Sequence, residues 1–272
     1  MEKDKQLNLR FDFGKNWATF LKGIDEERIN SAIDSLRNFL KVDDFSGLSF
    51  LDVGHGSGLF SLAARKLGAR VHSFDYDNNS VQCANTLKEK YFPGDSLWTI
   101  EQGSALDANY LSSIGKYDIV YSWGVLHHTG SMYAALSNVI LPMKANSKLF
   151  VSIYNTQLTT GFWKKIKKIY ISSSQIERSL LIAIFFVFFF LSYLIKDLIT
   201  PRNPCLRFKN KVRGMSFFTD VIDWIGGYPF ETARPEEIFN FFKERNLQLV
   251  NLSTVGGKMG CNEFVFQRIE KN

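Results

Sequence analysis

The chain has 272 residues, 45% of them apolar and 22% charged, and a formal net charge of +6. This length and composition suit one large α/β domain, or such a domain with an insertion, and exclude a disordered chain. Cys83, Cys205 and Cys261 lie far apart in the sequence. Their spacing excludes a disulfide framework and a cysteine zinc site, and it indicates a reducing compartment.

The chain begins with a polar stretch, Met1 to Gln6, which has no apolar run of the kind found in secretion signals. A helix is expected before the first strand, because Ile29, Ile33, Leu36 and Leu40 recur at helical spacing. This N-terminal segment, residues 1–46, precedes a region with a different pattern.

From about Gly47 to Asn155, short apolar runs alternate with helical patterns, which is typical of βα units on a parallel sheet. Strands are predicted at Ser49–Val53, Arg70–Phe74, Leu97–Gln102, Asp118–Trp123 and Lys148–Tyr154, and helices at Leu59–Leu67, Asn79–Tyr91 and Met132–Leu141. A helix that Pro235 opens (Pro235–Arg245) and strands at Leu247–Thr254 and Glu263–Arg268 complete the chain. The prediction is a Rossmann-like α/β fold: a seven-stranded, mostly parallel sheet with helices on both faces and an inserted helical cap.

The first predicted strand runs directly into a glycine-rich turn and a helix. Gly54, Gly56 and Gly58 would let the backbone bend tightly and approach a ligand where a Cβ would clash. An ordinary strand-to-helix turn is the alternative. Asp75 ends the second strand, 17 residues after Gly58, where an acid can accept hydrogen bonds from both hydroxyls of a ribose.

Asp52 lies immediately before the glycine turn and bears on the kind of ligand. A dinucleotide would place its anionic pyrophosphate at the start of the following helix, and a carboxylate there would repel it. The methionyl end of S-adenosylmethionine (SAM) carries an ammonium group, which a carboxylate attracts. Asp52 therefore favours SAM over NAD.

Four segments together resemble the motifs of class I SAM-dependent methyltransferases. Leu51-Asp-Val-Gly-His-Gly-Ser-Gly58 resembles their first motif, with His55 where many members carry Cys, Ala or Thr. Ser73-Phe-Asp-Tyr-Asp77 resembles the second, and Gly103-Ser-Ala-Leu-Asp107 the loop on the adenine side. The segment from Tyr117 to His128 resembles the fourth-strand motif that ends in V-L-H-H.

The resemblance implies a SAM site. It implies Asp75 on the ribose, Tyr76 against the adenine, and Ser104, Ala105 and Leu106 along the adenine edge. Ser104 stands where many members have an acid, so the contact with the adenine amino group is left to the backbone. The predicted SAM-binding residues of the first motif are Asp52, Gly54, His55, Gly56 and Gly58.

The residues after the fourth strand should line the methyl-donor pocket, because ligands sit at the carboxyl ends of strands in such sheets. Ser122 and Trp123 are assigned to that pocket. His128 and His127 are candidate catalytic proton acceptors, and helix packing is the alternative for each. A base is needed only if the acceptor must lose a proton early, as a hydroxyl would; otherwise positioning supplies much of the rate. No metal site is predicted.

Candidate residues for the methyl acceptor come from several segments. Trp17 lies in the N-terminal segment, which often covers the cofactor in methyltransferases of this fold. Tyr154 ends the fifth strand, and Tyr228 and Asn262 belong to loops rich in glycine and aromatic residues. Such loops commonly set specificity.

The insertion at residues 156–227 differs from the rest in composition. Residues 161–215 contain eleven Lys and Arg against Glu177 and Asp197, a net charge of +9 that leaves −3 for the remainder of the chain. Residues 180–195 are apolar except for Ser192 and Tyr193. Three interpretations stay open for this run: a buried cap over the acceptor site, a segment that dips into an anionic membrane, or a short spanning helix.

The sequence as a whole predicts SAM-dependent methyl transfer, with O-methylation of a small-molecule, glycan or lipid-linked acceptor expected. A non-catalytic SAM-binding subunit at a membrane and an RNA methyltransferase are the alternatives. Nucleic acid is disfavoured because the basic residues do not interleave with a stacking platform. The expected location is the cytoplasm, with peripheral attachment to the inner face of the membrane as an option. Residues 228–272 should complete the core.

Overall fold

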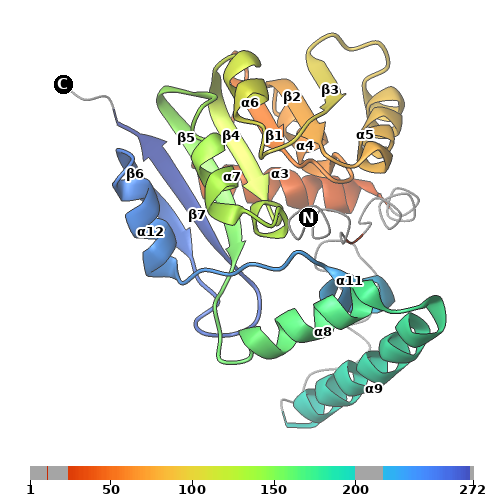
Figure 1. Cartoon of the computed structure of the whole chain (residues 1–272). Coiled ribbons are helices and arrows are strands. Elements are labelled where there is room, and N and C mark those ends of the chain that lie inside the picture. Colours follow the sequence, from red (N-terminus) through yellow and green to blue (C-terminus); the bar gives the residue numbers. More distant parts are fainter. Residues whose placement is uncertain (1–10, 12–23, 200–216, 270–272) are drawn as a thin grey trace.

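The computed structural model of the chain describes residue 11, residues 24–199 and residues 217–269. Its centre is a seven-stranded sheet in the order β3-β2-β1-β4-β5-β7-β6 (Figure 1). The neighbouring pairs from β3 to β5 are parallel, whereas β7 is antiparallel to both β5 and β6. The strand order reverses between β1 and β4, so the carboxyl ends of these two strands form a ligand-binding position typical of such sheets.

The predicted βα units are present, with boundaries shifted by a few residues. The first half contains α3 (Glu26–Leu40), β1 (Ser49–Val53), α4 (Leu59–Lys66), β2 (Arg70–Asp75), α5 (Asn78–Tyr91), β3 (Trp98–Gln102), α6 (Ala108–Ser113) and β4 (Tyr117–Trp123). Asp25, Asp77 and Asp107 each cap a helix by accepting a backbone N–H, which fixes the starts of α3, α5 and α6.

The second half contains η1 (Leu126–His128), α7 (Met132–Asn138), β5 (Met143–Tyr154), α8 (Thr160–Ser172), α9 (Gln175–Ile199), α11 (Phe217–Gly226), α12 (Pro235–Lys243), β6 (Leu247–Ser253) and β7 (Cys261–Arg268). Helix α12 begins at Pro235 as predicted. Strand β5 begins five residues earlier than predicted because Met143 pairs with Tyr117 of β4.

Helices cover both faces of the sheet and enclose two apolar cores. One core gathers α7 and α12 over β4, β5 and β7, and Leu136, Phe242 and Phe264 lie at its centre. The other packs α3 and α4 over β1 and β2, with Leu36, Phe50 and Leu62 fully buried. Burial of these two faces is the main stabilising contribution to the domain and holds the strand ends in place.

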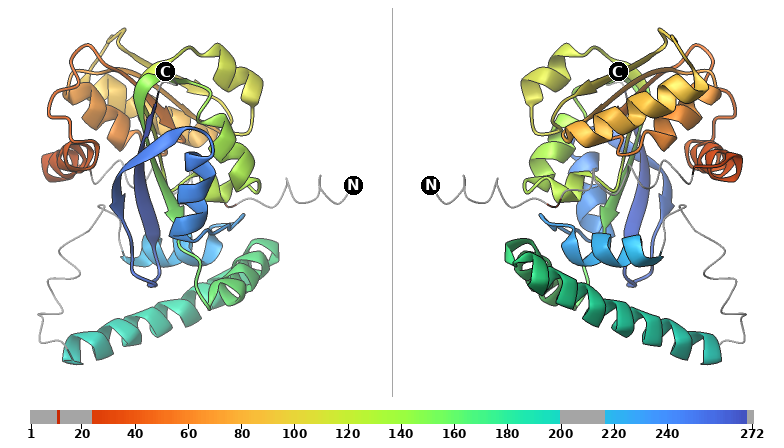
Figure 2. Two further views of the ribbon diagram at one scale, coloured as in Figure 1. Left: turned by 90° about the vertical axis from the view of Figure 1, so that its left-hand side faces the viewer. Right: turned by 90° about the vertical axis from the view of Figure 1, so that its right-hand side faces the viewer.

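The insertion forms a layer at one end of the molecule. In Figures 1 and 2, α8 and α11 lie between the sheet domain and α9, which runs along the outside. A third apolar cluster joins these helices, with Trp163, Phe185 and Ile225 buried within it. Of the three interpretations of the apolar run, the buried cap is wrong for α9, because most of its side chains are exposed.

Candidate active site

The glycine-rich turn between β1 and α4 adopts a backbone that favours glycine. Gly54 and Gly58 have φ angles of +78° and +81°. A Cβ on Gly54 would lie 2.4 Å from Cγ1 of Val125, and one on Gly58 would lie 2.9 Å from Cβ of Ala84. Both positions therefore combine a left-handed backbone with too little room for a side chain. The N–H groups of Gly54 and Gly58 bond to the carbonyls of Phe74 and His55, which closes the turn.

Asp75 lies at the end of β2, directly beside this turn. Its Oδ2 accepts the backbone N–H of Gly56 at 2.9 Å, and its Oδ1 accepts the N–H of Asp77 at 2.9 Å. Each carboxylate oxygen keeps a second lone pair, which is what two ribose hydroxyls need. Burial raises the pKa of Asp75, and the charge of His55 and these two N–H groups oppose the rise.

Asp52 is fully buried at the end of β1, under the glycine turn. Its Oδ2 accepts the hydroxyl of Ser61 at 2.6 Å. Burial raises the pKa of Asp52 to about 7, and the charge of Asp75 adds to the rise. A cation placed at Asp52 would offset this desolvation and hold the carboxylate ionised.

His55 occupies the second position of the turn and is buried. Its Nδ1 lies 3.1 Å from the carbonyl oxygen of Gly56. Its Nε2 is buried and has no hydrogen-bond partner among the described residues. A buried polar atom without a partner costs free energy, so a ligand atom at this point would be favoured. The glycine cradle, this unpartnered nitrogen and the two carboxylates fit a ligand with a ribose and an ammonium group.

The adenine-side residues predicted from the motifs lie next to Asp75 along the sheet edge. Tyr76 is 55% exposed, so its ring has a face available at the surface. The Ser104 hydroxyl accepts the backbone N–H of Leu106 at 3.2 Å, which closes a short turn. Ala105 is buried, and its carbonyl accepts the side-chain amide of Asn138 at 3.0 Å. The serine is thus engaged in holding the loop.

The two residues assigned to the methyl-donor pocket at the end of β4 differ in their contacts. The Ser122 hydroxyl is buried and donates to the carbonyl of Val53 at 2.9 Å, which ties β4 to β1 just below the turn. Trp123 donates its indole N–H to Glu263 of β7 at 2.6 Å. Trp123 therefore turns toward β7, on the far side of β5.

The two histidines follow in η1 and pack against each other and against Tyr154. The His127 ring is 4.0 Å from that of Tyr154 and 4.5 Å from that of His128, centroid to centroid. His128 Nδ1 lies 2.6 Å from the carbonyl oxygen of Pro229. Because a carbonyl only accepts, Nδ1 carries the proton and Nε2 is the acceptor nitrogen.

Burial keeps both imidazoles neutral. It lowers the pKa of His128 to about 3, and it holds the pKa of His127 well below its ordinary value. The charge of Lys167 lowers both further. At neutral pH His128 is therefore a neutral hydrogen-bond acceptor and a weak base.

Lys167 of α8 is a residue of this cluster that sequence reasoning missed. It is fully buried, and its ammonium donates to the carbonyl of Trp224. Its Nζ lies 4.8 Å from the centroid of the Trp224 ring and 4.7 Å from that of Phe230. Burial lowers the pKa of Lys167 to about 7, against the opposing charge of Asp223. The buried positions of α8 recur at helical spacing, and a lysine on that apolar face was the signal.

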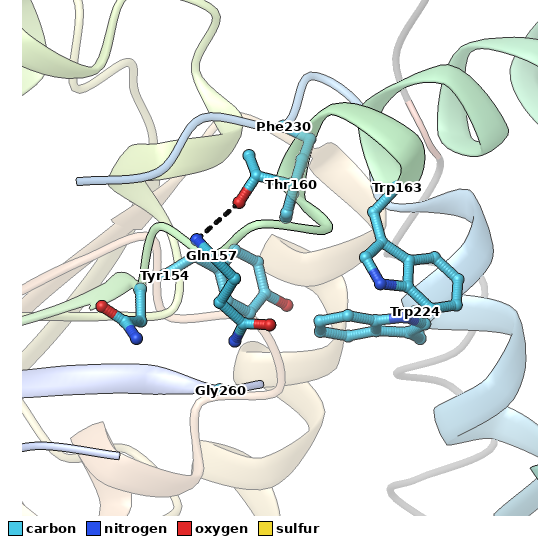
Figure 3. Close-up of a pocket in the computed structure, with 8 residues that line it drawn as sticks. Tyr154, Gln157, Thr160, Trp163, Trp224, Phe230 and Gly260 are labelled. Atoms are coloured by element: carbon cyan, nitrogen blue, oxygen red, sulfur yellow. Dashed lines mark hydrogen bonds between the residues drawn. The ribbon is translucent and has the colours of Figure 1, made fainter. Parts of the chain in front are cut away.

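A small pocket opens where the inserted helices α8 and α11 meet the sheet domain. Figure 3 shows its lining, in which the indole rings of Trp163 and Trp224 lie on the cap side. Tyr154, at the end of β5, also lines it. The backbone N–H of Gln157 donates to Thr160 Oγ1 at 2.8 Å and so fixes the start of α8 beside the pocket (Figure 3). Aromatic walls beside the histidines suit an acceptor with an apolar portion.

The other predicted acceptor residues do not line this pocket, although Asn262 bonds to Asn155, which does. Tyr228 is buried, and its backbone carbonyl accepts the N–H of Phe11 at 2.9 Å. Asn262 is buried; its side chain accepts the N–H of Val255 and donates to Asn155 at 3.1 Å. Its polar atoms thus already bond within the protein. Trp17 lies outside the described residues.

Comparison with known families supplies the identification. The family model for a methyltransferase domain matches residues 24–249, which is most of the chain. The chain belongs to this methyltransferase family. The match begins before α3 and ends within β6, and so spans the inserted helices.

Individual relatives of this methyltransferase match over shorter segments. The ribosomal protein L11 methyltransferase of Helicobacter hepaticus is 38% identical over 82 residues, which are 30% of this chain and 25% of that protein. The ubiquinone biosynthesis O-methyltransferase of Parvibaculum lavamentivorans is 27% identical over 123 residues, 43% of this chain and 44% of that protein. The matched segments therefore cover 25% and 44% of the lengths of these two curated relatives.

Among solved structures, the magnesium protoporphyrin IX methyltransferase of Synechocystis with bound SAH is similar over 89% of this chain and 82% of its own. The TM-score is 0.52 at 15% sequence identity, which establishes a common fold. The predicted Rossmann-like, seven-stranded methyltransferase fold is thereby confirmed.

Proposed function

We propose that the protein transfers the methyl group of SAM to an oxygen atom of a small-molecule, glycan or lipid-linked acceptor. The observation that carries the cofactor half is the hydrogen bond from Gly56 to Asp75, which sets a carboxylate beside a turn of left-handed glycines. Membership of a methyltransferase family and the fold of SAH-bound structures support the same choice.

Four groups of this chain would hold SAM. Asp75 would accept the ribose hydroxyls, Asp52 would face the methionyl ammonium, and Tyr76 would cover the adenine. The backbone around Gly54 would approach the cofactor closely. SAM supplies a methyl carbon activated by its sulfonium. The protein then has to align an acceptor atom with that carbon and exclude competing water.

The acceptor half rests on the cluster at the ends of β4 and β5. His128, with Nε2 as its acceptor nitrogen, would orient a hydroxyl by accepting its hydrogen bond and would receive the proton as the bond to carbon forms. Tyr154 packs edge-on against His128, with ring centroids 5.5 Å apart, and limits how that ring can turn. The pocket beside Trp163 and Trp224 would hold the rest of the acceptor.

The first test has two steps. Calorimetry with SAM should show binding to the wild-type protein and none to Asp75→Ala. The protein is then incubated with SAM labelled on its methyl group and a cell extract, which is split into lipid, glycan and small-molecule fractions. Label in one of these fractions, absent with Asp75→Ala, identifies the acceptor class.

Two results would redirect the proposal. SAM binding without any formation of S-adenosylhomocysteine would indicate a non-catalytic subunit. Label that nuclease removes would indicate RNA as the acceptor.

For the O-methyl mechanism, His128→Gln should lower kcat and leave SAM affinity unchanged; an unchanged kcat would remove His128 from the mechanism. A location on the cytoplasmic side of a membrane belongs to the same proposal, since a lipid-linked acceptor would be reached there.

A further inference from the structure

Helix α9 carries an exposed apolar stripe from Ile176 to Ile195. Its members share spacings of three or four residues and therefore one side of the helix. They are Ile176, Leu180, Ile184, Val187, Phe188, Leu191 and Ile195. Leu180 is 62% exposed, and Ile184, Val187 and Phe188 are each 54% exposed. An apolar surface of this extent on a protein marks an interaction site.

The opposite side of α9 packs on the inserted helices α8 and α11. The Trp163 ring lies 5.7 Å from that of Phe185 and 6.0 Å from that of Phe189, centroid to centroid. Leu181 and Ile182 pack against the same cluster. Near its start, Arg178 of α9 also donates to the carbonyls of Tyr170 and Ile171 on α8. Figure 2 shows α9 lying across the end of the molecule in both views.

The charge of the neighbouring helix α8 favours an anionic partner for the stripe. Lys164, Lys165 and Lys168 on α8 are exposed, and residues 161–195 contain five Lys and Arg against Glu177, a net charge of +4. Two copies of the chain joined through this stripe would bring two such basic segments together. An anionic lipid surface instead offers hydrocarbon to the stripe and negative headgroups to the lysines.

We propose that α9 docks the protein on an anionic lipid bilayer, lying in the plane of the membrane with the stripe Ile176–Ile195 turned into it. By length and composition Gln175–Ile195 passes as a membrane span, and 6% of its most apolar stretch is buried. A spanning orientation would pull the middle of the helix away from Trp163, whereas a helix lying flat keeps that contact. The inference depends on α9 and α8 alone and is independent of methyl transfer.

The experiment is co-flotation of the full chain with vesicles. Vesicles of phosphatidylcholine alone are compared with vesicles that also contain phosphatidylglycerol, at low and at high salt. The wild-type protein should float with the anionic vesicles, and high salt should weaken its binding. Changing Lys164, Lys165 and Lys168 together to Gln should lower affinity for anionic vesicles about a hundredfold, since each lysine near such a surface contributes about 1 kcal/mol.

A matched pair of variants tests the stripe itself. Ile184→Glu with Phe188→Glu should abolish flotation, because two carboxylates would enter the hydrocarbon. The control, Val250→Glu with Leu252→Glu, places the same charges on exposed apolar positions of β6 and should float like the wild type. Both double variants should retain the wild-type affinity for SAM, which reports an intact cofactor site.

Three outcomes would overturn the proposal. The first is a wild-type protein that stays at the bottom of the gradient in every condition. The second is a wild-type dimer in lipid-free solution that Ile184→Glu with Phe188→Glu converts to a monomer, which would assign the stripe to a second copy. The third is protein that remains in vesicles after washing with alkaline carbonate, which would assign α9 to a spanning orientation. Release by that wash agrees with a helix lying flat.

Discussion

Replacement of Asp52 by Asn separates the stability of the domain from its affinity for SAM. The substitution keeps the size of the side chain and an oxygen that can accept the Ser61 hydroxyl, but it removes the charge. The pKa of Asp52 rises from 3.8 to about 7 because the carboxyl is buried. At about 1.4 kcal/mol for each tenfold change in proton affinity, ionised Asp52 destabilises the ligand-free fold by about 4 kcal/mol above pH 7.

The sign follows from the raised pKa. The unfolded chain ionises this carboxyl near pH 4 and the folded protein near pH 7, so wild-type stability is lost as the pH rises through that interval. Asp52→Asn should therefore unfold at higher urea concentration than the wild type at pH 8, and the gain should be smaller at pH 5.5. In calorimetry at pH 8, its affinity for SAM should fall at least about tenfold, because the ammonium loses its partner.

Asp34→Asn, on the exposed side of α3, is the control for a simple change in net charge and should alter neither quantity. The reasoning is refuted if Asp52→Asn changes the stability by the same amount at both pH values. An unchanged affinity for SAM at pH 8 would separately refute the placement of the ammonium at Asp52.

The remaining predictions concern the cradle and the cap. Gly54→Ala should lower the free energy of unfolding by more than Gly94→Ala, since both have positive φ but only Gly54 meets Val125; equal losses in urea unfolding would contradict a packing cost. Asp75→Ala should abolish SAM binding in calorimetry, and unchanged affinity would remove Asp75 from the cofactor site. Lys167→Met should stabilise the fold more at pH 6 than at pH 9, because the lysine pKa falls from 10.5 to about 7 on folding, so the cost of burial is full below pH 7 and declines as the pH rises toward 10.5; an equal effect at the two pH values would refute a buried charge.

Much of the fold could be read from local patterns. The strand before Gly54 and the helix that Pro235 begins follow from apolar periodicity and from backbone preferences, which act over a few residues. The cofactor side also lay within short segments, since the glycine turn and Asp75 sit at the ends of adjacent strands. Their proximity follows once the sheet is parallel, and the hydrogen bond from Gly56 to Asp75 agrees with it.

The acceptor side depends on the tertiary structure, because its residues come from segments far apart in the chain. The sequence by itself determined the methyltransferase family, the succession of strands and helices along the chain, and the basic and apolar composition of the insertion. Only the packing of α8 on the sheet domain decided that Lys167 is buried close enough to lower the pKa of His128, and that Asn262 bonds to Asn155 inside the protein. The apolar run of α9 is equally consistent in sequence with a buried and an exposed helix. Its exposure was decided by which side of the helix meets Trp163, a contact that no local pattern specifies.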